Sequence, residues 1–188
     1  MMFKGEASGD NAGYAVSGAG DVDGDGKPDI MIGAPLHNAS GGSSNQGAAY
    51  VFANLNSSMG DKSLADARLK MVAPDDNEVG TDVCFAGDTN GDGVDELLVG
   101  GPKGALSYDR GNVYLVDETA QGTLDLATNS RARFLFFGGS TFYAGATLAG
   151  GSDVDGDGSD DVLIGVPLAH GSTQNDSGWV YLFRGFVP

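Results

Sequence analysis

The sequence has little that could cross-link it and little positive charge. Cys84 is the single cysteine among 188 residues, so an intrachain disulfide is excluded. Ten lysines and arginines stand against 26 aspartates and glutamates, and the resulting net charge of -16 repels nucleic acid phosphates and anionic lipid head groups. No apolar run approaches the roughly 18 residues that a membrane-spanning helix needs. We therefore expect no nucleic acid partner and no membrane insertion.

Proline is also scarce, whereas glycine is abundant. Six prolines against 32 glycines, without a Gly-X-Y period, exclude collagen and are typical of a chain with many tight turns. The hydrophobic share of 40% is enough to build a core once the polar loops are set aside. Many turns between short apolar runs favour β-structure, and we expect a single repeat array over residues 1–188.

Three similar units fill the chain. Asp-rich segments begin at Asp21, Asp88 and Asp153, which gives steps of 67 residues (21 to 88) and 65 residues (88 to 153). Each unit also has an apolar segment opening with Gly eight residues before the Asp-rich loop, at Gly13, Gly80 and Gly145. After each loop follow an apolar run ending in Gly-X-Pro and a second run that opens with Gly and contains Tyr. These pairs of runs are 29–35 and 47–52, 96–102 and 111–116, and 161–167 and 178–183.

A fourth strand is expected at 68–72 and 133–137, and the N-terminal strand 2–6 stands in the same place before Gly13. The fold class that this predicts is all-β, with β-propeller blades of four antiparallel strands and three repeats per chain. We expect blades at about 1–60, 61–125 and 126–188. The strand at 2–6 would complete the third blade or a blade of a neighbouring chain.

The Asp-rich loops are candidate calcium sites. Oxygen-bearing side chains recur at loop positions one, three, five and nine, with Gly at four and six, and Ca²⁺ takes six to eight oxygen ligands. The carbonyl at position seven would add a ligand, whereas Mg²⁺ demands stricter octahedral geometry. The structural alternative is a plain acidic turn, because Asp and Gly are good turn formers. The candidate ligands, for about three Ca²⁺ per chain, are Asp21, Asp23, Asp25, Lys27 and Asp29; Asp88, Asn90, Asp92, Val94 and Glu96; Asp153, Asp155, Asp157, Ser159 and Asp161.

Two details refine this expectation. A helix-loop-helix calcium site needs a Glu at position twelve, but Ile32, Val99 and Ile164 occupy that position and exclude it. In the middle loop Asn90 replaces an Asp and Glu96 stands at position nine, so three carboxylates remain instead of four. We expect weaker calcium binding there.

Together these motifs resemble the FG-GAP repeat family, the calcium-bearing blades of integrin α-subunit propellers. The resemblance covers nearly the whole chain, although the Phe-Gly pair of the family reads Ala12-Gly13, Val79-Gly80 and Ala144-Gly145 here. It implies Ca²⁺ binding by the side chains at positions one, three, five and nine. It also implies an extracellular or cell-surface adhesion module that binds a protein partner.

Catalytic machinery is not evident in the sequence. His37 and His170 lie in variable loops that do not align, and we expect both to be solvated, so the chain is interpreted as a non-enzyme. The alternatives are a lectin-like propeller using Trp179, and an accessory domain of a polysaccharide-active enzyme. Propellers have about four to eight blades. The three repeats therefore suggest a homodimer of 2 × 3 blades or a fragment of a longer propeller.

Overall fold

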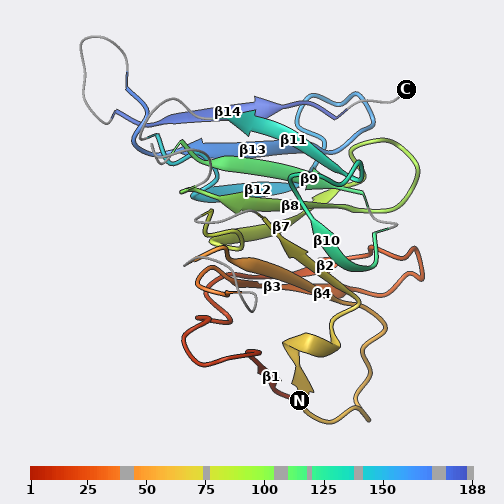
Figure 1. Cartoon of the computed structure of the whole chain (residues 1–188). Coiled ribbons are helices and arrows are strands. Elements are labelled where there is room, and N and C mark those ends of the chain that lie inside the picture. Colours follow the sequence, from red (N-terminus) through yellow and green to blue (C-terminus); the bar gives the residue numbers. More distant parts are fainter. Residues whose placement is uncertain are drawn as a thin grey trace.

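Among the described residues of the computed structural model, the regular elements are β-strands apart from one 3-10 turn, as the sequence predicts (Figure 1). It describes residues 1–38, 45–73, 77–103, 110–117, 120–137, 142–170 and 177–185, with the side chains of 134–137 left out of the description. One 3-10 turn, η1 (Leu64–Asp66), interrupts the strands. Within the described part, no helix is long and apolar enough to cross a membrane.

Three sheets are stacked face to face along the chain (Figure 1). The first sheet has the order β10-β6-β4-β3-β2, with β2 (Val16–Gly20), β3 (Asp29–Ala34), β4 (Ala48–Phe52), β6 (Leu69–Val72) and β10 (Gly122–Asp125). The second has the order β11-β9-β8-β7, with β7 (Asp82–Gly87), β8 (Glu96–Gly101), β9 (Asn112–Val116) and β11 (Ala132–Phe137). The third has the order β12-β13-β14, with β12 (Thr147–Ser152), β13 (Asp161–Val166) and β14 (Trp179–Phe183).

The core lies between the sheets, because alternate residues of each strand point to opposite faces. Met31 and Val51 of the first sheet pack with Phe85 and Leu97 of the second in one buried cluster. Leu98, on the other face of the second sheet, belongs to a second cluster with residues of the third sheet. Each sheet is therefore one blade of a stack in which consecutive repeats are neighbours.

The boundaries between blades fall later in the chain than predicted. The strand β6 pairs antiparallel with β4 of the first sheet, and β11 pairs antiparallel with β9 of the second. The predicted divisions at 60/61 and 125/126 would cut both strands away from their sheets. Each fourth strand follows a long connection and pairs with the third strand of its own sheet, so the antiparallel part of the first sheet ends at Val72 and that of the second at Phe137.

Two short parallel pairings involve strands in the connections between third and fourth strands. The strand β10 lies in the connection between β9 and β11, yet it pairs parallel with β6 of the first sheet. In the same parallel sense, β5 (Lys62–Ser63), in the connection between β4 and β6, pairs with β1 (Phe3–Lys4). The strand β1 thus stands to the first sheet as β6 stands to the second, in the place of a preceding blade's fourth strand. It lies at the N-terminal end of the stack, away from β14 (Figure 1).

The two ends of the stack differ in their cover. At the first end, a cover made of β1, β5 and η1 packs on Ile32, Tyr50 and Phe52 through Phe3 and Leu64. At the other end, the third sheet turns outward a set of apolar side chains that we call the open face. The open face consists of Leu163, Val180 and Leu182, which are 39%, 71% and 43% exposed.

Candidate metal centres

The three Asp-rich loops share one backbone geometry. In each, the position-one carboxylate accepts hydrogen bonds from the N–H groups at positions five and six. For Asp21 the donors are Asp25 at 3.1 Å and Gly26 at 2.8 Å. The matching distances are 3.0 and 2.8 Å at Asp88, and 3.1 and 2.9 Å at Asp153. This carboxylate therefore organises the turn of its own loop.

The position-nine carboxylate closes each loop from the other side. It begins the strand that follows and accepts the N–H of position two at 2.9 Å, from Val22 to Asp29, Thr89 to Glu96 and Val154 to Asp161. All three carboxylate residues are buried, with 1% to 4% exposure. Between these two anchors, the glycines at positions four and six have positive φ, as the predicted sharp turn requires. They are Gly24 and Gly26, Gly91 and Gly93, and Gly156 and Gly158.

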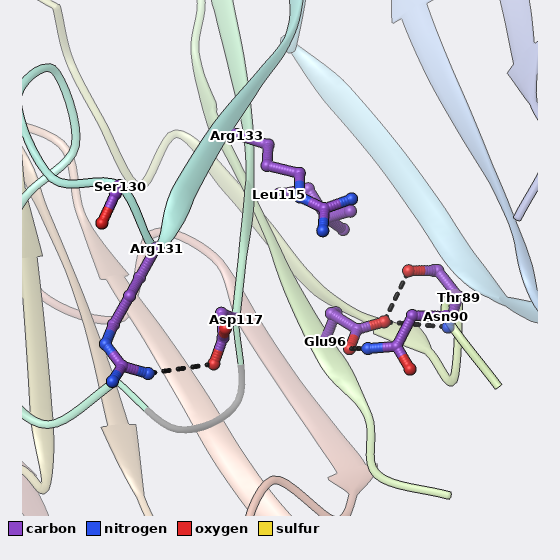
Figure 2. A pocket seen from close by; sticks show the side chains of 8 residues that line it. All are labelled: Thr89, Asn90, Glu96, Leu115, Asp117, Ser130, Arg131 and Arg133. Atoms are coloured by element: carbon purple, nitrogen blue, oxygen red, sulfur yellow. Dashed lines mark hydrogen bonds and ion pairs between the residues drawn. The ribbon is translucent and has the colours of Figure 1, made fainter. Parts of the chain in front are cut away.

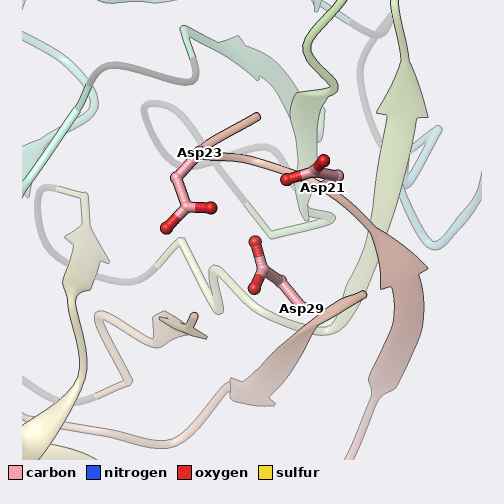
Figure 3. Close-up of side chains that lie close together, drawn as sticks. All are labelled: Asp21, Asp23 and Asp29. Atoms are coloured by element: carbon pink, nitrogen blue, oxygen red, sulfur yellow. The ribbon is translucent and has the colours of Figure 1, made fainter. Parts of the chain in front are cut away.

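The first loop brings three carboxylates together (Figure 3). One oxygen each from Asp21, Asp23 and Asp29 lies within 4.8 Å of the others. Asp23 Oδ1 and Asp29 Oδ1 are buried and have no hydrogen-bond partner. Burial raises the pKa of Asp29, and the charges of Asp23 and Asp21 raise it further. Unpartnered buried carboxylate oxygens are rare and costly, so this donor set fits a hard divalent cation.

Position five does not join this group. Asp25 instead accepts hydrogen bonds from the backbone N–H of Lys27 at 2.9 Å and from its Nζ at 2.6 Å. The hydrogen bond from the Lys27 side chain lowers the pKa of Asp25. The backbone carbonyl of Lys27 is a predicted calcium ligand. Its side-chain ammonium group also places a positive charge at the exposed rim of the loop.

The third loop repeats the triad with Asp153, Asp155 and Asp161, again within 4.8 Å of one another. Its carboxylates have more partners, because Asp161 Oδ1 accepts the Gly185 N–H at 2.9 Å and Asp155 lies 3.0 Å from Arg184 Nε. The backbone N–H of Gly158 lowers the pKa of Asp153. The triad thus matches that of the first loop in composition and spacing, with more of its oxygens engaged by the protein.

In the third loop, too, position five stays outside the triad. Asp157 accepts the backbone N–H of Ser159 at 3.0 Å, as Asp25 does from Lys27. The equivalent bond in the middle loop runs from Val94 to Asp92, also at 3.0 Å. Position five therefore serves the turn of the loop in all three repeats, and ligation by it stays a prediction.

In the middle loop, the position-nine carboxylate is hydrogen-bonded by residues of the same loop. Glu96 accepts hydrogen bonds from the Thr89 hydroxyl and from the Asn90 side-chain amide, in addition to the Thr89 N–H (Figure 2). Within the described residues, Asp88, Asp92 and Glu96 do not form a close group of the kind found in the other two loops. The longer Glu side chain and the amide of Asn90 thus replace a carboxylate cluster with internal hydrogen bonds. Weaker calcium binding at this loop stays a prediction.

Two aspartates that the sequence analysis did not single out connect the loops to one another. Asp95 and Asp160 stand at position eight of the middle and third loops, and each bonds to the first residue of the preceding loop. Nothing in the alternating ligand pattern marks position eight, and the first loop has Pro28 there. The recurrence of Asp in two of the three loops is the one signal that the sequence carries.

The two histidines and the tryptophan lie away from the loops. His37 was expected to be solvated, but it is 3% exposed, and its Nδ1 lies 3.0 Å from Asp10 Oδ2, because the N-terminal segment folds over it. His170 is partly buried and contacts the ring of Phe142. Trp179 is 40% exposed beside the open face.

Known proteins resemble the chain over most of its length. A family model described as FG-GAP repeat matches residues 12–52 and 144–183, which contain the first and third loops. Integrin alpha-PS5 of Drosophila melanogaster is 35% identical over 98% of the chain, and Integrin alpha-PS3 of the same organism is 31% identical over 98%. Integrin alpha-5 of Xenopus laevis is 30% identical over 87%. The chain spans 17%, 15% and 15% of the lengths of these proteins. The chain therefore contains FG-GAP repeats at residues 12–52 and 144–183, and integrin α-subunits are similar to it over most of its length.

Proposed function

We propose that the chain is a calcium-stabilised, non-enzymatic binding module of the adhesion type. The observation that carries this proposal is the pair of buried, unpartnered oxygens on Asp23 and Asp29 inside a three-carboxylate group. A divalent cation would give both oxygens a partner and would neutralise their mutual repulsion. The relatives named integrins support the adhesion role and an extracellular or cell-surface location.

The first and third loops would hold the cation most tightly. Asp21, Asp23 and Asp29 would supply ligands in the first, and the equivalent triad in the third. When bound, Ca²⁺ supplies positive charge and coordination bonds that hold the loop shut. The protein prepares the site by fixing the position-one and position-nine carboxylates with backbone N–H groups. A cation that binds the folded chain and not the unfolded chain raises stability by mass action.

Unfolding measurements test this proposal. Thermal unfolding in millimolar Ca²⁺ should occur many degrees above unfolding in excess chelator, and Asp29→Asn should shrink that difference. Glu96→Gln, at the same position of the middle loop, is the matched control and should leave most of it. Calorimetric titration should find two tighter sites and a weaker or undetectable third. Identical unfolding curves with and without Ca²⁺ would contradict the proposal.

A protein partner is the ligand class that we favour. The acidic loops lie at one end of the strands, where a bound cation would hold them in a fixed shape for a partner to contact. Capture experiments with candidate cell-surface proteins, in Ca²⁺ and in chelator, test this role. Binding that persists unchanged after Asp29→Asn and chelation would show that the calcium loops do not shape the contact surface.

A glycan is the second candidate, supported by one observation. Trp179 is 40% exposed and borders a shallow depression with Thr147, Pro167 and Gly178. An exposed indole can stack on a sugar ring, although it can equally cover a protein contact. Glycan-array binding that Trp179→Ala abolishes and Trp179→Phe partly retains would favour this candidate over a protein ligand.

Assembly of two chains would bring together complementary ends. The strand β1 stands in the place of a preceding blade's fourth strand, and the third sheet has three strands within the described residues. We propose that β1 of one chain completes the third sheet of a second chain, giving six blades. Light scattering should then give twice the chain mass. A single-chain mass at micromolar concentration would contradict this assembly and leave the calcium proposal intact.

A further inference from the structure

Neighbouring loops are joined by the same pair of hydrogen bonds at both junctions in the chain. Between the first and middle loops, Asp21 N–H donates to Asp95 Oδ2 at 2.8 Å, and Asp95 N–H donates to Asp21 O at 3.1 Å. Between the middle and third loops, Asp88 N–H donates to Asp160 Oδ2 at 3.1 Å, and Asp160 N–H donates to Asp88 O at 2.9 Å. Four bonds thus repeat one geometry across some 65 residues of sequence.

The joined residues are not equivalent within their loops. Asp95 and Asp160 hold position eight, whereas Asp21 and Asp88 hold position one, whose carboxylate organises the preceding loop. The position-eight side chain therefore bonds to the loop before its own. Gly87 is shaped for this approach, since a Cβ there would lie 2.1 Å from Asp160 Oδ2 and its φ is +79°. A side chain at residue 87 would push the carboxylate away.

We propose that Asp95 and Asp160 are clasp residues, which position the first ligand residue of the preceding loop and so couple that loop to the next blade. Each clasp holds both the N–H and the C=O of position one, which fixes the direction in which its carboxylate leaves the backbone. The clasp of Asp95 serves the calcium triad of the first loop. The clasp of Asp160 serves the internally bonded middle loop. This inference rests on the proposed calcium binding for its affinity consequences, but not for its geometry.

The experiment uses the fact that each position-eight aspartate bonds to the loop before its own. The backbone amides of Gly26, Gly93 and Gly158, at position six of each loop, report the three loops separately in NMR spectra during Ca²⁺ titration. Asp95→Ala should weaken the Ca²⁺ response of Gly26 by about tenfold, the order expected for losing a charge-assisted hydrogen bond. The response of Gly158 should be unchanged. An aspartate that acted only within its own loop would instead disturb Gly93 and spare Gly26.

Asp160→Ala is the matched control, because it removes the same charge at the same position. It should shift the amide of Gly93 while leaving the Ca²⁺ responses of Gly26 and Gly158 unchanged. Asp95→Asn keeps an acceptor oxygen without the charge and should recover most of the Gly26 response. If Asp95→Asn and Asp95→Ala weaken it equally, the effect is one of charge alone and the clasp is wrong.

A second readout needs no calcium. Hydrogen exchange of the Asp21 amide in chelator should become faster in Asp95→Ala, and exchange of the Asp88 amide faster in Asp160→Ala, each without the other changing. If wild-type amides show no response to Ca²⁺ but these exchange rates shift as stated, the calcium proposal fails and the clasp stands. Unchanged exchange at both amides would overturn the clasp whatever the calcium result.

Discussion

The first and third sheets are built from equivalent strands of different repeats, but their outer faces meet different surroundings. On the first sheet Tyr50 is fully buried beneath the cover formed by β1, β5 and η1. On the third sheet Val180 is 71% exposed. At the same places in the repeat as Leu163, Val180 and Leu182, the first two sheets have side chains that are 0% to 4% exposed against the next blade: Met31, Ala49 and Val51, and Leu98, Val113 and Leu115.

This difference shows that the repeat determines where apolar residues stand, independently of what packs on each face. In a β-strand with alternating apolar residues, those residues keep the same positions in the sequence whether or not another segment packs on them. What decides burial is the neighbouring segment, either the next blade or, at the first end, the cover. Contiguous exposed apolar residues mark contact surfaces, so the open face is the surface where a further blade would pack.

The largest expected effect comes from two leucines at the same place in consecutive repeats. Leu98 is fully buried between the second and third sheets, whereas Leu163 is 39% exposed on the open face. Leu98→Ala should lower the free energy of unfolding by about 2–5 kcal/mol, because it leaves a cavity. Leu163→Ala should cost less than about 1 kcal/mol when the protein is dilute enough to be a single chain. Urea unfolding of both variants measures the difference.

Equal costs for Leu98→Ala and Leu163→Ala would contradict the open face. A cost for Leu163→Ala that grows with protein concentration would instead show that a second chain covers it. The two variants carry the same chemical change, so side-chain propensity and unfolded-state effects largely cancel between them.

The cover should give a somewhat smaller effect. Leu64 in η1 is 1% exposed and packs on the outer face of the first sheet. Leu64→Ala should cost about 2 kcal/mol, at the low end for a buried leucine, because a short 3-10 turn can relax toward the gap. Leu182→Ala, on the open face, is the comparison and should cost less than half as much. Hydrogen exchange localised to β1 and β5 would show whether the cover opens as a unit.

Sequence periodicity predicted the parts of the fold that repeat within each unit. The loops, the Gly-X-Pro strands and the Tyr-containing strands all lie where their spacing placed them, since each depends on contacts inside one blade. Contacts made across units carry no such periodic signal, and the parallel pairing of β10 with β6 is one of them. The burial of His37 beside Asp10, a contact inside the first unit, was also missed.

The same distinction between contacts inside one repeat and contacts between repeats applies to the candidate sites. Asp21, Asp23 and Asp29 come together as the ligand pattern predicts, because one short loop determines their spacing. Asp25 was predicted with them, but its carboxylate accepts the backbone N–H of Lys27, a bond that recurs at position five of the other two loops, so ligation by Asp25 stays a prediction. The clasp residues Asp95 and Asp160 were missed, since their partners lie in a loop that precedes them by a whole repeat.

The smallest expected effect concerns the junction behind the open face. Asp82 of the second sheet accepts the Leu148 N–H of the third at 2.7 Å and its neighbour's N–H at 2.9 Å, yet burial raises its pKa in spite of these bonds. Thr147 stands at the same place in the third repeat, so the open face offers no such carboxylate. A raised pKa in the folded state favours the protonated form there. The stabilisation from protonating Asp82 is therefore full below the pKa of the unfolded chain and is lost as the pH rises through the folded value.

Asp82→Asn should accordingly be as stable as the wild type, or slightly more stable, at pH 7, because the amide keeps an acceptor for Leu148 without a buried charge. This advantage should shrink as the pH falls, because the raised pKa lets the wild-type carboxylate take up its proton in the folded state. Urea midpoints of both proteins at pH 7 and pH 4, in chelator so that calcium does not titrate with them, measure the change. A variant that is clearly less stable at pH 7 would mean that the charged carboxylate itself holds the second and third blades together. The junction would then depend on charge, whereas the open face has Thr147 in place of that carboxylate beside its apolar side chains.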